Sequence, residues 1–302
     1  MLSRREFLAA SAGAAVVATG AGSAFAADAP KPVALKKAIK YSMIAGKLSV
    51  LEKFELAKKC GFAGLEMDSP SGVNREEAKK AAAATGVVIH GVIDSQHWGS
   101  PLSHPDEKVR AKGFAALETA LDDAGFYGTA TTMLLVPGVV NKEVSFDQCW
   151  ERSTAVVKKA IPLAEKAKVP IAIETVWNNF ILKPEQMVKY VDQFESPWVG
   201  AYFDISNMIK YGVPPAEWVR KLGKRMLKFD FKGYSKALAK EKGNDGAGFG
   251  AKIGEGDEHW PEVLKAVAEV GYKGEYFTAE VGGGGEERLM DISKRMDKIL
   301  GN

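Results

Sequence analysis

The sequence predicts an α/β protein built as a single (β/α)8 barrel. Short apolar runs alternate with longer amphipathic runs eight times after residue 37, and no linker or shift in composition divides the chain. Strands that alternate with helices pair in parallel through right-handed crossovers, and eight regular repeats favour a closed barrel. The chain has 302 residues, which is long enough for a barrel of ~250 residues.

The elements follow in order along the chain. The apolar runs that we interpret as buried strands lie at 39–44, 63–67, 87–93, 132–136, 170–173, 198–203, 226–231 and 276–279. The amphipathic runs that we interpret as helices lie at 49–60, 74–84, 105–124, 145–168, 183–194, 214–222, 260–270 and 286–300. Asn74 is a candidate N-cap with Glu77 completing a capping box, and Ser145 is a second candidate cap. An open doubly wound sheet would need a Gly-rich phosphate loop after the first strand, where the pattern is absent.

The start of the chain precedes this barrel. Arg4 and Arg5 stand before an Ala-rich apolar run at 9–17 and a small-residue A-x-A site at 24–26. This order predicts a signal peptide and resembles the twin-arginine export signal, whose substrates cross the membrane folded. The apolar run is too short and too rich in Ala and Gly for a strong membrane span, although a retained N-terminal anchor is the alternative. We expect a signal peptide at 1–26, a spacer at 27–37, a barrel at 38–302 and a periplasmic or extracellular protein.

Charge and cysteine content exclude several classes of function. The formal net charge is +3, from 41 basic and 38 acidic side chains. This balance offers no field that would attract nucleic acid or an anionic membrane surface. Cys60 and Cys149 fall in predicted helices, and two cysteines do not indicate a disulfide framework, so buried free thiols are expected.

Carboxylates stand at the ends of four consecutive predicted strands. They are Glu174, Asp204, Asp230 and Glu280. Each alone is as well explained by a structural salt bridge, but in a barrel all four would meet at the mouth where active sites form. Like charges at close range raise one another's pKa strongly, so a bound cation would be needed to keep them ionised. Because all the donors are oxygens, one hard divalent ion is expected, Mn²⁺ or Mg²⁺ in preference to Zn²⁺.

Six segments of the chain carry a family resemblance: GFAGLEMD (61–68), IAIETVWNNF (171–180), WVGAYFDISN (198–207), MLKFDFKGY (226–234), KIGEGDEHWPEVLKAVAEVGYKG (252–274) and YFTAEV (276–281). In their order and spacing the chain resembles the xylose isomerase-like barrel superfamily, in the branch of sugar phosphate isomerases and epimerases. The resemblance implies a metal held by Glu, Asp, His and Glu, with the two Glu as acid and base. Carried over by motif, Glu174 and Glu280 match the two Glu and Asp204 matches the Asp. The resemblance also implies a dimer or tetramer.

Two positions depart from that pattern. Asp230 stands where the family has the His of a His-x-Lys-Asp segment, with Lys232 retained and Gly233 in place of the Asp. Asn207 replaces the His of an Asp-x-x-His segment. An Asp in place of His adds negative charge to the site, hardens it and weakens the Lewis acidity that a substrate would experience.

The residues support proton transfer next to a sugar carbonyl, with Glu174 and Glu280 removing and returning the proton. This indicates a metal-dependent isomerase or epimerase of a free or keto sugar. The same groups support β-elimination from a 3-keto-glycoside, and a barrel that binds sugar without turnover is a further alternative. A nuclease on this fold would need several metal-binding His and a basic groove, whereas the chain has 4 His.

Other polar and aromatic residues near strand ends are candidates for substrate binding. They are Glu66, His97, Trp177, Asn207 and Lys232. His90 is expected to be a satisfied core histidine, since its neighbours are apolar. The Gly-rich stretch 242–256 is either a lid or a plain flexible loop. The four glycines at 282–285 allow a close approach of backbone to a ligand, while the phosphate reading lacks a neighbouring cluster of Arg or Lys.

Overall fold

Eight parallel strands close into one barrel, as the sequence predicted. The computed structural model describes residues 34–128 and 131–301, so the predicted signal peptide lies outside the described residues. The strands pair in chain order from the first to the eighth, and the eighth pairs with the first. They are β1 (Lys36–Lys40), β2 (Gly64–Ser69), β3 (Val88–Asp94), β4 (Thr132–Leu135), β5 (Ile171–Glu174), β6 (Val199–Asp204), β7 (Met226–Phe231) and β8 (Tyr276–Ala279).

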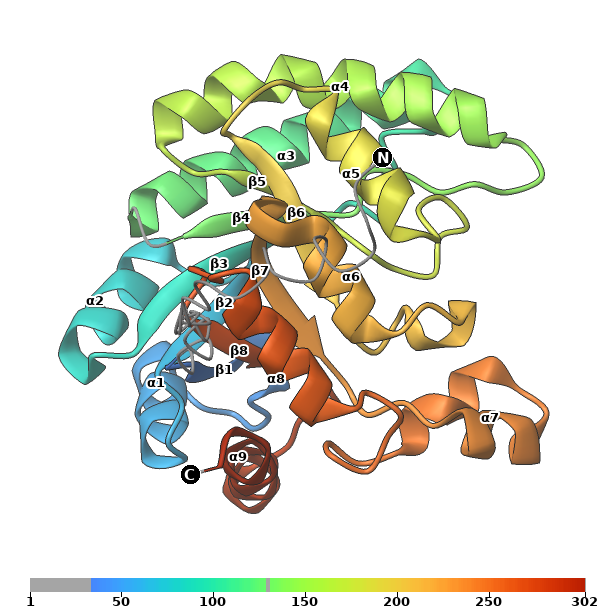
Figure 1. The fold of residues 1–302 in the computed structure, drawn as a ribbon. Helices are drawn as coiled ribbons and strands as arrows, with labels where there is room; N and C mark the ends of the chain where they lie inside the picture. The colour runs from blue at the N-terminus through green and yellow to red at the C-terminus, as the bar shows by residue number, and fades with distance from the viewer. Residues whose placement is uncertain (1–33, 129–130, 302) are drawn as a thin grey trace, which may run out of the picture. The chain divides into compact units, whose positions relative to one another are not determined.

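Helices surround the barrel and cover its outer face (Figure 1). They are α1 (Val50–Lys59), α2 (Arg75–Thr85), α3 (Glu107–Tyr127), α4 (Phe146–Ala167), α5 (Pro184–Asp192), α6 (Pro215–Leu222), α7 (Lys236–Lys242), α8 (Trp260–Glu269) and α9 (Glu286–Leu300). The main hydrophobic core lies between these helices and the strands, where Phe203 on β6 stacks on Trp218 of α6. Burial of apolar surface is the dominant favourable term that holds the layers together, and aromatic pairs such as this one contribute to it.

Side-chain caps fix where several helices begin. Asn74 accepts hydrogen bonds from the backbone N–H groups of Glu76 and Glu77, which confirms it as an N-cap. The reciprocal capping box predicted there forms instead at Ser145 with Gln148, where the predicted cap is confirmed, and at Ser49 with Glu52. Each cap satisfies backbone donors that the first turn of a helix leaves without partners.

The strand register brings charged residues together at one rim. Parallel pairing sets Lys40 beside Glu66, Glu174 beside Tyr202, and Asp204 beside Asp230. Because all the strands run in the same direction, their carboxyl ends meet at the same end of the barrel. The four predicted carboxylates therefore share a rim.

Two predicted boundaries are wrong, and both bear on the site. The strand expected at 39–44 is β1, which ends at Lys40 and continues as a short 3-10 helix, η1 (Tyr41–Met43). The Gly-rich stretch expected to be a lid or a flexible loop begins at the end of α7 and includes another 3-10 helix, η4 (Asp245–Gly250). Ser235 and Asn244 cap these two elements with side-chain hydrogen bonds, so the segment between β7 and α8 is structured.

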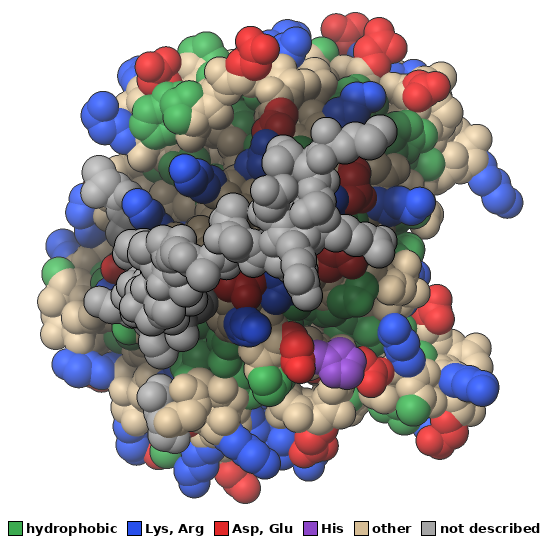
Figure 2. Space-filling model, in the orientation of Figure 1, with side chains coloured by type: hydrophobic (Ala, Val, Ile, Leu, Met, Phe, Trp, Pro, Cys, Tyr) green, Lys and Arg blue, Asp and Glu red, His purple; other side chains and the backbone are tan. Residues whose placement is uncertain are grey.

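The surface carries charges of both signs. On the face shown in Figure 2, Lys and Arg side chains are interspersed with Asp and Glu. Cys60 and Cys149 are buried free thiols, as predicted. Within residues 34–128 and 131–301, no helix has both the length and the apolar character needed to cross a bilayer.

Candidate active site

Four carboxylates converge at the rim. Glu174, Asp204, Asp230 and Glu280 each present an oxygen, and these oxygens all lie within 4.8 Å of one another. The first three side chains are buried, whereas Glu280 is 39% exposed to the cavity. Such a cluster cannot remain fully ionised without positive charge beside it.

Burial and neighbouring carboxylates raise the pKa values of three of these acids, whereas neighbouring lysines lower that of the fourth. Burial, together with Glu280, raises the pKa of Glu174 to about 8. Burial likewise raises the pKa of Asp204, and it holds the pKa of Asp230 well above its usual range. Burial opposes the ionised form of Glu280 too, but Lys232 and Lys40 outweigh it and lower its pKa.

Two lysines supply part of the compensating charge. Lys232 donates to Glu280 Oε2 at 2.9 Å and forms a short contact with Asp204 Oδ2. Lys40, at the end of β1, is almost completely buried and donates to Glu66 Oε2 at 2.6 Å. Its Nζ also lies 2.9 Å from Asp230 Oδ2. Although burial opposes the charged ammonium, these carboxylates hold the pKa of Lys40 well above its usual range.

The donor set fits a hard divalent cation. Asp230 forms an ion pair with Lys40, yet neither of its buried carboxylate oxygens has a hydrogen bond of good geometry among the described residues. Within the same part of the chain, the Glu174 carboxylate has neither a hydrogen bond nor an ion pair, although it is buried. Buried oxygens without partners are stabilised by a cation, and an all-oxygen set suits Mg²⁺ or Mn²⁺.

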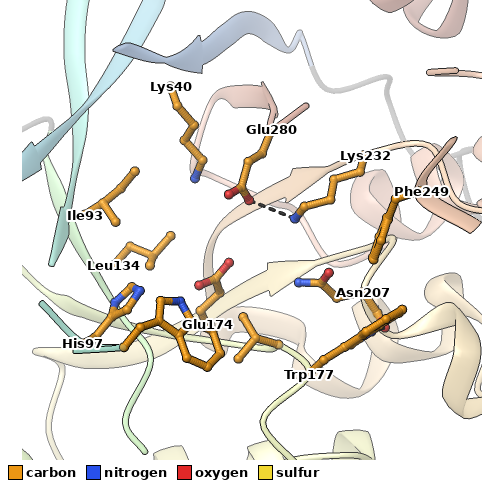
Figure 3. Close-up of a pocket in the computed structure, with 12 residues that line it drawn as sticks. Lys40, Ile93, His97, Leu134, Glu174, Trp177, Asn207, Lys232, Phe249 and Glu280 are labelled. Carbon is orange, nitrogen blue, oxygen red and sulfur yellow. Dashed lines mark hydrogen bonds and ion pairs between the residues drawn. The ribbon is translucent and has the colours of Figure 1, made fainter. Parts of the chain in front are cut away.

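A cavity of about 280 Å³ opens onto these carboxylates. Glu174, Glu280 and Lys232 line it, together with Asn207, Trp177 and His97, as Figure 3 shows. Asn207 is held in place because its amide donates to Thr175 O at 3.2 Å, while its backbone N–H donates to Asp204 Oδ1 at 2.8 Å. Six of the seven residues expected as acid and base or around a substrate therefore line one cavity, and Glu66 is the exception.

His97 lies at the wall of the cavity and is buried. Burial lowers its pKa to about 4, so the imidazole is neutral near pH 7. Nδ1 accepts a hydrogen bond from the backbone N–H of Val136 at 3.3 Å, which leaves the proton on Nε2. The ring is therefore suited to donate a hydrogen bond to a sugar hydroxyl.

Glu66 lies below the cavity and does not line it. Its side chain is completely buried, and its oxygens accept hydrogen bonds from Tyr202 Oη at 2.7 Å and from Lys40. Glu66 was expected to bind the substrate, but in the structure it supports Lys40 instead. His90 is a core residue as expected, stacked on Tyr276 with ring centroids 4.0 Å apart. Neither of its ring nitrogens, however, has a hydrogen-bond partner among the described residues.

Three residues near the cavity were missed by sequence reasoning. Lys40 and Phe249 line it, and Glu258 supports the loop after β7. Glu258 is completely buried and accepts hydrogen bonds from the backbone N–H of Tyr234 at 2.7 Å and from Ser206 Oγ at 3.1 Å. Lys40 could have been found if the end of β1 had been placed correctly, whereas Phe249 has no signal in the sequence that separates it from an ordinary loop residue.

The run of glycines at 282–285 has a structural explanation. Gly283 lies so close to η1 that an added Cβ would meet Met43 O at 1.9 Å. The neighbouring Gly284 donates its N–H to the same carbonyl at 3.0 Å and accepts from Ala45 N at 3.0 Å. The run therefore lets the chain after β8 pack against the chain after β1.

Removal of the Lys40 ammonium should destabilise the protein strongly. The Lys40→Met substitution leaves Glu66 and Asp230 buried without a countercharge, so we expect a loss of about 3–5 kcal/mol in the free energy of unfolding, measured with urea. Lys36→Met is the matched control on the same strand, since Lys36 pairs with Glu275 at the exposed surface and its loss should change stability by less than about 1 kcal/mol. Equal effects of the two substitutions would contradict this account.

Glu258 should make stability depend on pH. Burial raises its pKa to about 7, above the value of about 4.3 of an unfolded Glu. The folded state thus binds more protons between these values, and stability falls as the pH rises from about 4.3 to 7. Glu258→Gln removes this contribution while it keeps the acceptor oxygen. The variant should therefore gain stability relative to the native protein on going from pH 5 to pH 8, by on the order of 2 kcal/mol. A difference between the two proteins that is constant over this range would show that Glu258 titrates normally.

Comparisons with known proteins agree with this architecture. A family model of the xylose isomerase-like TIM barrel matches residues 54–298. The chain is 27% identical over 169 residues to L-ribulose-5-phosphate 3-epimerase UlaE of Escherichia coli K12, which is 52% of this chain and 59% of that relative. The chain thus matches little more than half the length of this curated relative.

Solved structures of similar fold cover more of the chain. The 3-keto-D-glucoside 4-epimerase YcjR of E. coli has a TM-score of 0.72 at 14% identity, over 89% of this chain and 100% of that one. The D-psicose 3-epimerase of Clostridium cellulolyticum H10 has a TM-score of 0.67 at 20% identity, over 88% and 96% of the two chains. At 14% and 20% sequence identity, the similarity of these structures establishes the fold alone. Because the family model matches most of this chain, from residue 54 to residue 298, the chain belongs to the xylose isomerase-like TIM barrel family.

Proposed function

We propose that this protein is a divalent-metal-dependent isomerase or epimerase that moves a proton next to the carbonyl of a sugar. The observation that carries the proposal is the pair Glu174 and Glu280, which line one cavity inside a cluster of four carboxylates. They come from β5 and β8, two strands that are not neighbours in the barrel. Relatives named as sugar 3-epimerases support the same class of reaction.

The position of the two glutamates suits epimerisation. Inversion of a carbon requires that a proton leaves from one face of the sugar and returns to the other, so an acid and a base must stand on opposite sides of it. Glu174 has no partner among the described residues that would hold it away from a substrate, and Lys232 orients Glu280. A divalent ion held by Glu174, Asp204, Asp230 and Glu280 would supply Lewis-acid stabilisation of the developing enediolate oxygen.

Lys40 offsets the change from His to Asp that the family resemblance indicates at position 230. An Asp adds a negative charge, but the Lys40 ammonium lies 2.9 Å from its carboxylate. The pair Lys40 and Asp230 therefore brings less net negative charge to the site than Asp230 alone would. This argues that the departure from the family pattern is compatible with catalysis.

The substrate that we propose is an unphosphorylated sugar. Among the described residues that line the cavity, the cations are Lys40 and Lys232, and both are engaged by carboxylates. A phosphate group would therefore lack a cationic partner there. The relative from E. coli is named for a 5-phosphate sugar, so we propose a different substrate for this chain.

Exchange with solvent tests the reaction. In D₂O, the Mn²⁺-loaded protein should place deuterium on a carbon next to the carbonyl of a ketohexose or a 3-keto-glucoside. Glu174→Gln and Glu280→Gln should each lower the rate of incorporation by about 10²–10⁴-fold, because each removes an acid–base group. Both should also lower the metal content measured on the purified protein. Glu255→Gln is the control, since Glu255 pairs with Arg295 at the surface.

Three outcomes would revise the proposal. Unchanged deuterium incorporation and metal content in both variants would refute the assignment of the site. Release of an alcohol from a 3-keto-glucoside would favour β-elimination, which begins with the same proton abstraction. Binding of sugar without deuterium incorporation or product would indicate a sugar-binding barrel.

We also propose that the protein is exported, on the basis of the twin arginines and the A-x-A site at residues 24–26. Expression of the full chain in a bacterium with a twin-arginine pathway should yield a periplasmic protein whose N-terminus, read by sequencing, is residue 27. Replacement of both arginines, Arg4 and Arg5, by Lys should retain the protein in the cytoplasm. Export of this variant at the native level would argue against the twin-arginine route.

A further inference from the structure

Three aromatic rings pack together at one side of the cavity, and two of them, Trp177 and Phe249, line it. Trp177, Tyr234 and Phe249, here called the aromatic wall, pack against one another: the ring centroids of Trp177 and Phe249 are 4.9 Å apart, and those of Tyr234 and Phe249 are also 4.9 Å apart. Trp177 follows β5, Tyr234 follows β7, and Phe249 lies in η4. The segment between β7 and α8 therefore contributes two of the three rings.

Polar contacts hold the aromatic wall in one position. The indole N–H of Trp177 donates to Asn207 O, and Lys210 Nζ lies 3.8 Å from the centroid of the Trp177 ring. The same Lys210 forms an ion pair with Asp245 of η4 at 3.6 Å. Buried Glu258 accepts a hydrogen bond from the backbone N–H of Tyr234. These contacts use the indole N–H of Trp177 and the backbone N–H of Tyr234 within the protein, and Trp177 and Phe249 present ring surface to the cavity.

The aromatic wall is continuous with the proposed reaction site. Trp177 and Phe249 line the same cavity as Glu174 and Glu280, and both rings are partly exposed. In Figure 3, Trp177 and Phe249 lie beyond Lys232 and Asn207, on the side away from Ile93 and Leu134. Lys232 bridges the two regions, since it binds Glu280 and its Nζ lies 5.9 Å from the Phe249 centroid.

The cavity has two kinds of lining, a polar one around the carboxylates and an aromatic one at Trp177 and Phe249. A sugar ring that reacts between Glu174 and Glu280 needs hydroxyl and carbonyl contacts, which the carboxylates, His97 and Asn207 offer. The two rings that line the cavity, Trp177 and Phe249, offer no further polar group there, and the faces of aromatic rings bind flat apolar surfaces, such as a phenyl ring or the C–H face of a pyranose. A free monosaccharide held at the carboxylates would not need this surface.

We propose that the aromatic wall is a second subsite, which binds the aglycone ring of a glycoside while the linked keto sugar occupies the carboxylate site. The substrate class is thus a keto-glycoside with a ring as its aglycone, in preference to a free monosaccharide. This inference rests on the proposed function, because it places the reacting sugar between Glu174 and Glu280. Simple packing of η4 on the barrel would explain the contacts among the three rings, but not the exposure of two of them to the cavity.

Binding of two probes that differ only in the aglycone tests the subsite. Phenyl and methyl 3-keto-β-D-glucoside are titrated into the full-length, Mn²⁺-loaded protein by calorimetry. The native protein should bind the phenyl compound about 3- to 10-fold more tightly, the range expected for one aromatic contact. Phe249→Ala and Phe249→Leu should each bring this ratio close to 1. Phe249→Tyr should restore it.

A matched control and a check of folding accompany these variants. Phe114→Ala removes a half-buried Phe that lines a surface cleft beside α3 and α4, and it should keep the native ratio. Circular dichroism and the thermal midpoint identify a variant that has lost its fold, and Phe249→Leu retains apolar bulk if Phe249→Ala does not fold. Equal affinity of the native protein for the two probes, or a native ratio in both Phe249→Ala and Phe249→Leu, would overturn the subsite.

Deuterium incorporation separates failure of the subsite from failure of the proposed function. If free ketoses or methyl 3-keto-glucoside take up deuterium from D₂O but the phenyl preference is absent, the aromatic wall is ordinary packing and the reaction stands. If no sugar takes up deuterium but the phenyl preference is present and depends on Phe249, the subsite stands in a sugar-binding protein. Absence of both would overturn both.

Discussion

The constraint on which this structure depends is the negative charge buried at one rim of the barrel. Glu66, Glu174, Asp204, Asp230 and Glu280 lie within a small volume where solvent screening is weak. Lys40 and Lys232 offset part of this charge, and the ion pairs that they form leave more carboxylates than ammonium groups. Burial raises the pKa values of Glu174, Asp204 and Asp230, and repulsion from the neighbouring carboxylates adds to this effect. The residual negative charge is the reason why an all-oxygen site here suits a divalent cation.

Residues below the cavity fix the positions of these charged side chains. Lys40 contacts both Asp230 and Glu66, and Tyr202 donates to Glu66 from the strand next to Asp230. The chain Asp230–Lys40–Glu66–Tyr202 crosses the barrel interior below the cavity, so a shift of any member would leave a buried charge without its partner. Such a network restricts the position of Asp230 more tightly than packing alone would. Asp204 is held in a similar way, because its carboxylate contacts Lys232 and accepts a hydrogen bond from the backbone N–H of Asn207.

Most of the barrel and half of the site could be predicted from sequence, for a physical reason. Strands buried on both faces produce apolar runs, and a carboxylate directly after such a run, as at Glu174 or Asp204, must face the mouth. Lys40 was missed because β1 was placed several residues too late, so that its end appeared to be Ile44. The role of Glu66 could not be deduced, because alternation shows which side of the strand it lies on but not that Lys40 and Tyr202 would reach it. Phe249 was hidden in a Gly-rich stretch, whose two short helices depend on caps and on contacts with distant rings.

The balance of charge also determines how the cavity can distinguish substrates. Since Lys40 and Lys232 are used to stabilise carboxylates, an anionic group on a substrate would meet repulsion from Glu174 and Glu280 without a cation to offset it. Discrimination must then come from hydroxyl contacts, from a bound metal and from apolar surface. Phe249, in the segment between β7 and α8, supplies that apolar surface together with Trp177, and the buried Tyr234 packs against both rings. Under the proposed function, a site whose lysines are already committed would therefore select a neutral sugar by the shape of its rings, and the aromatic wall is the surface that we propose for this selection.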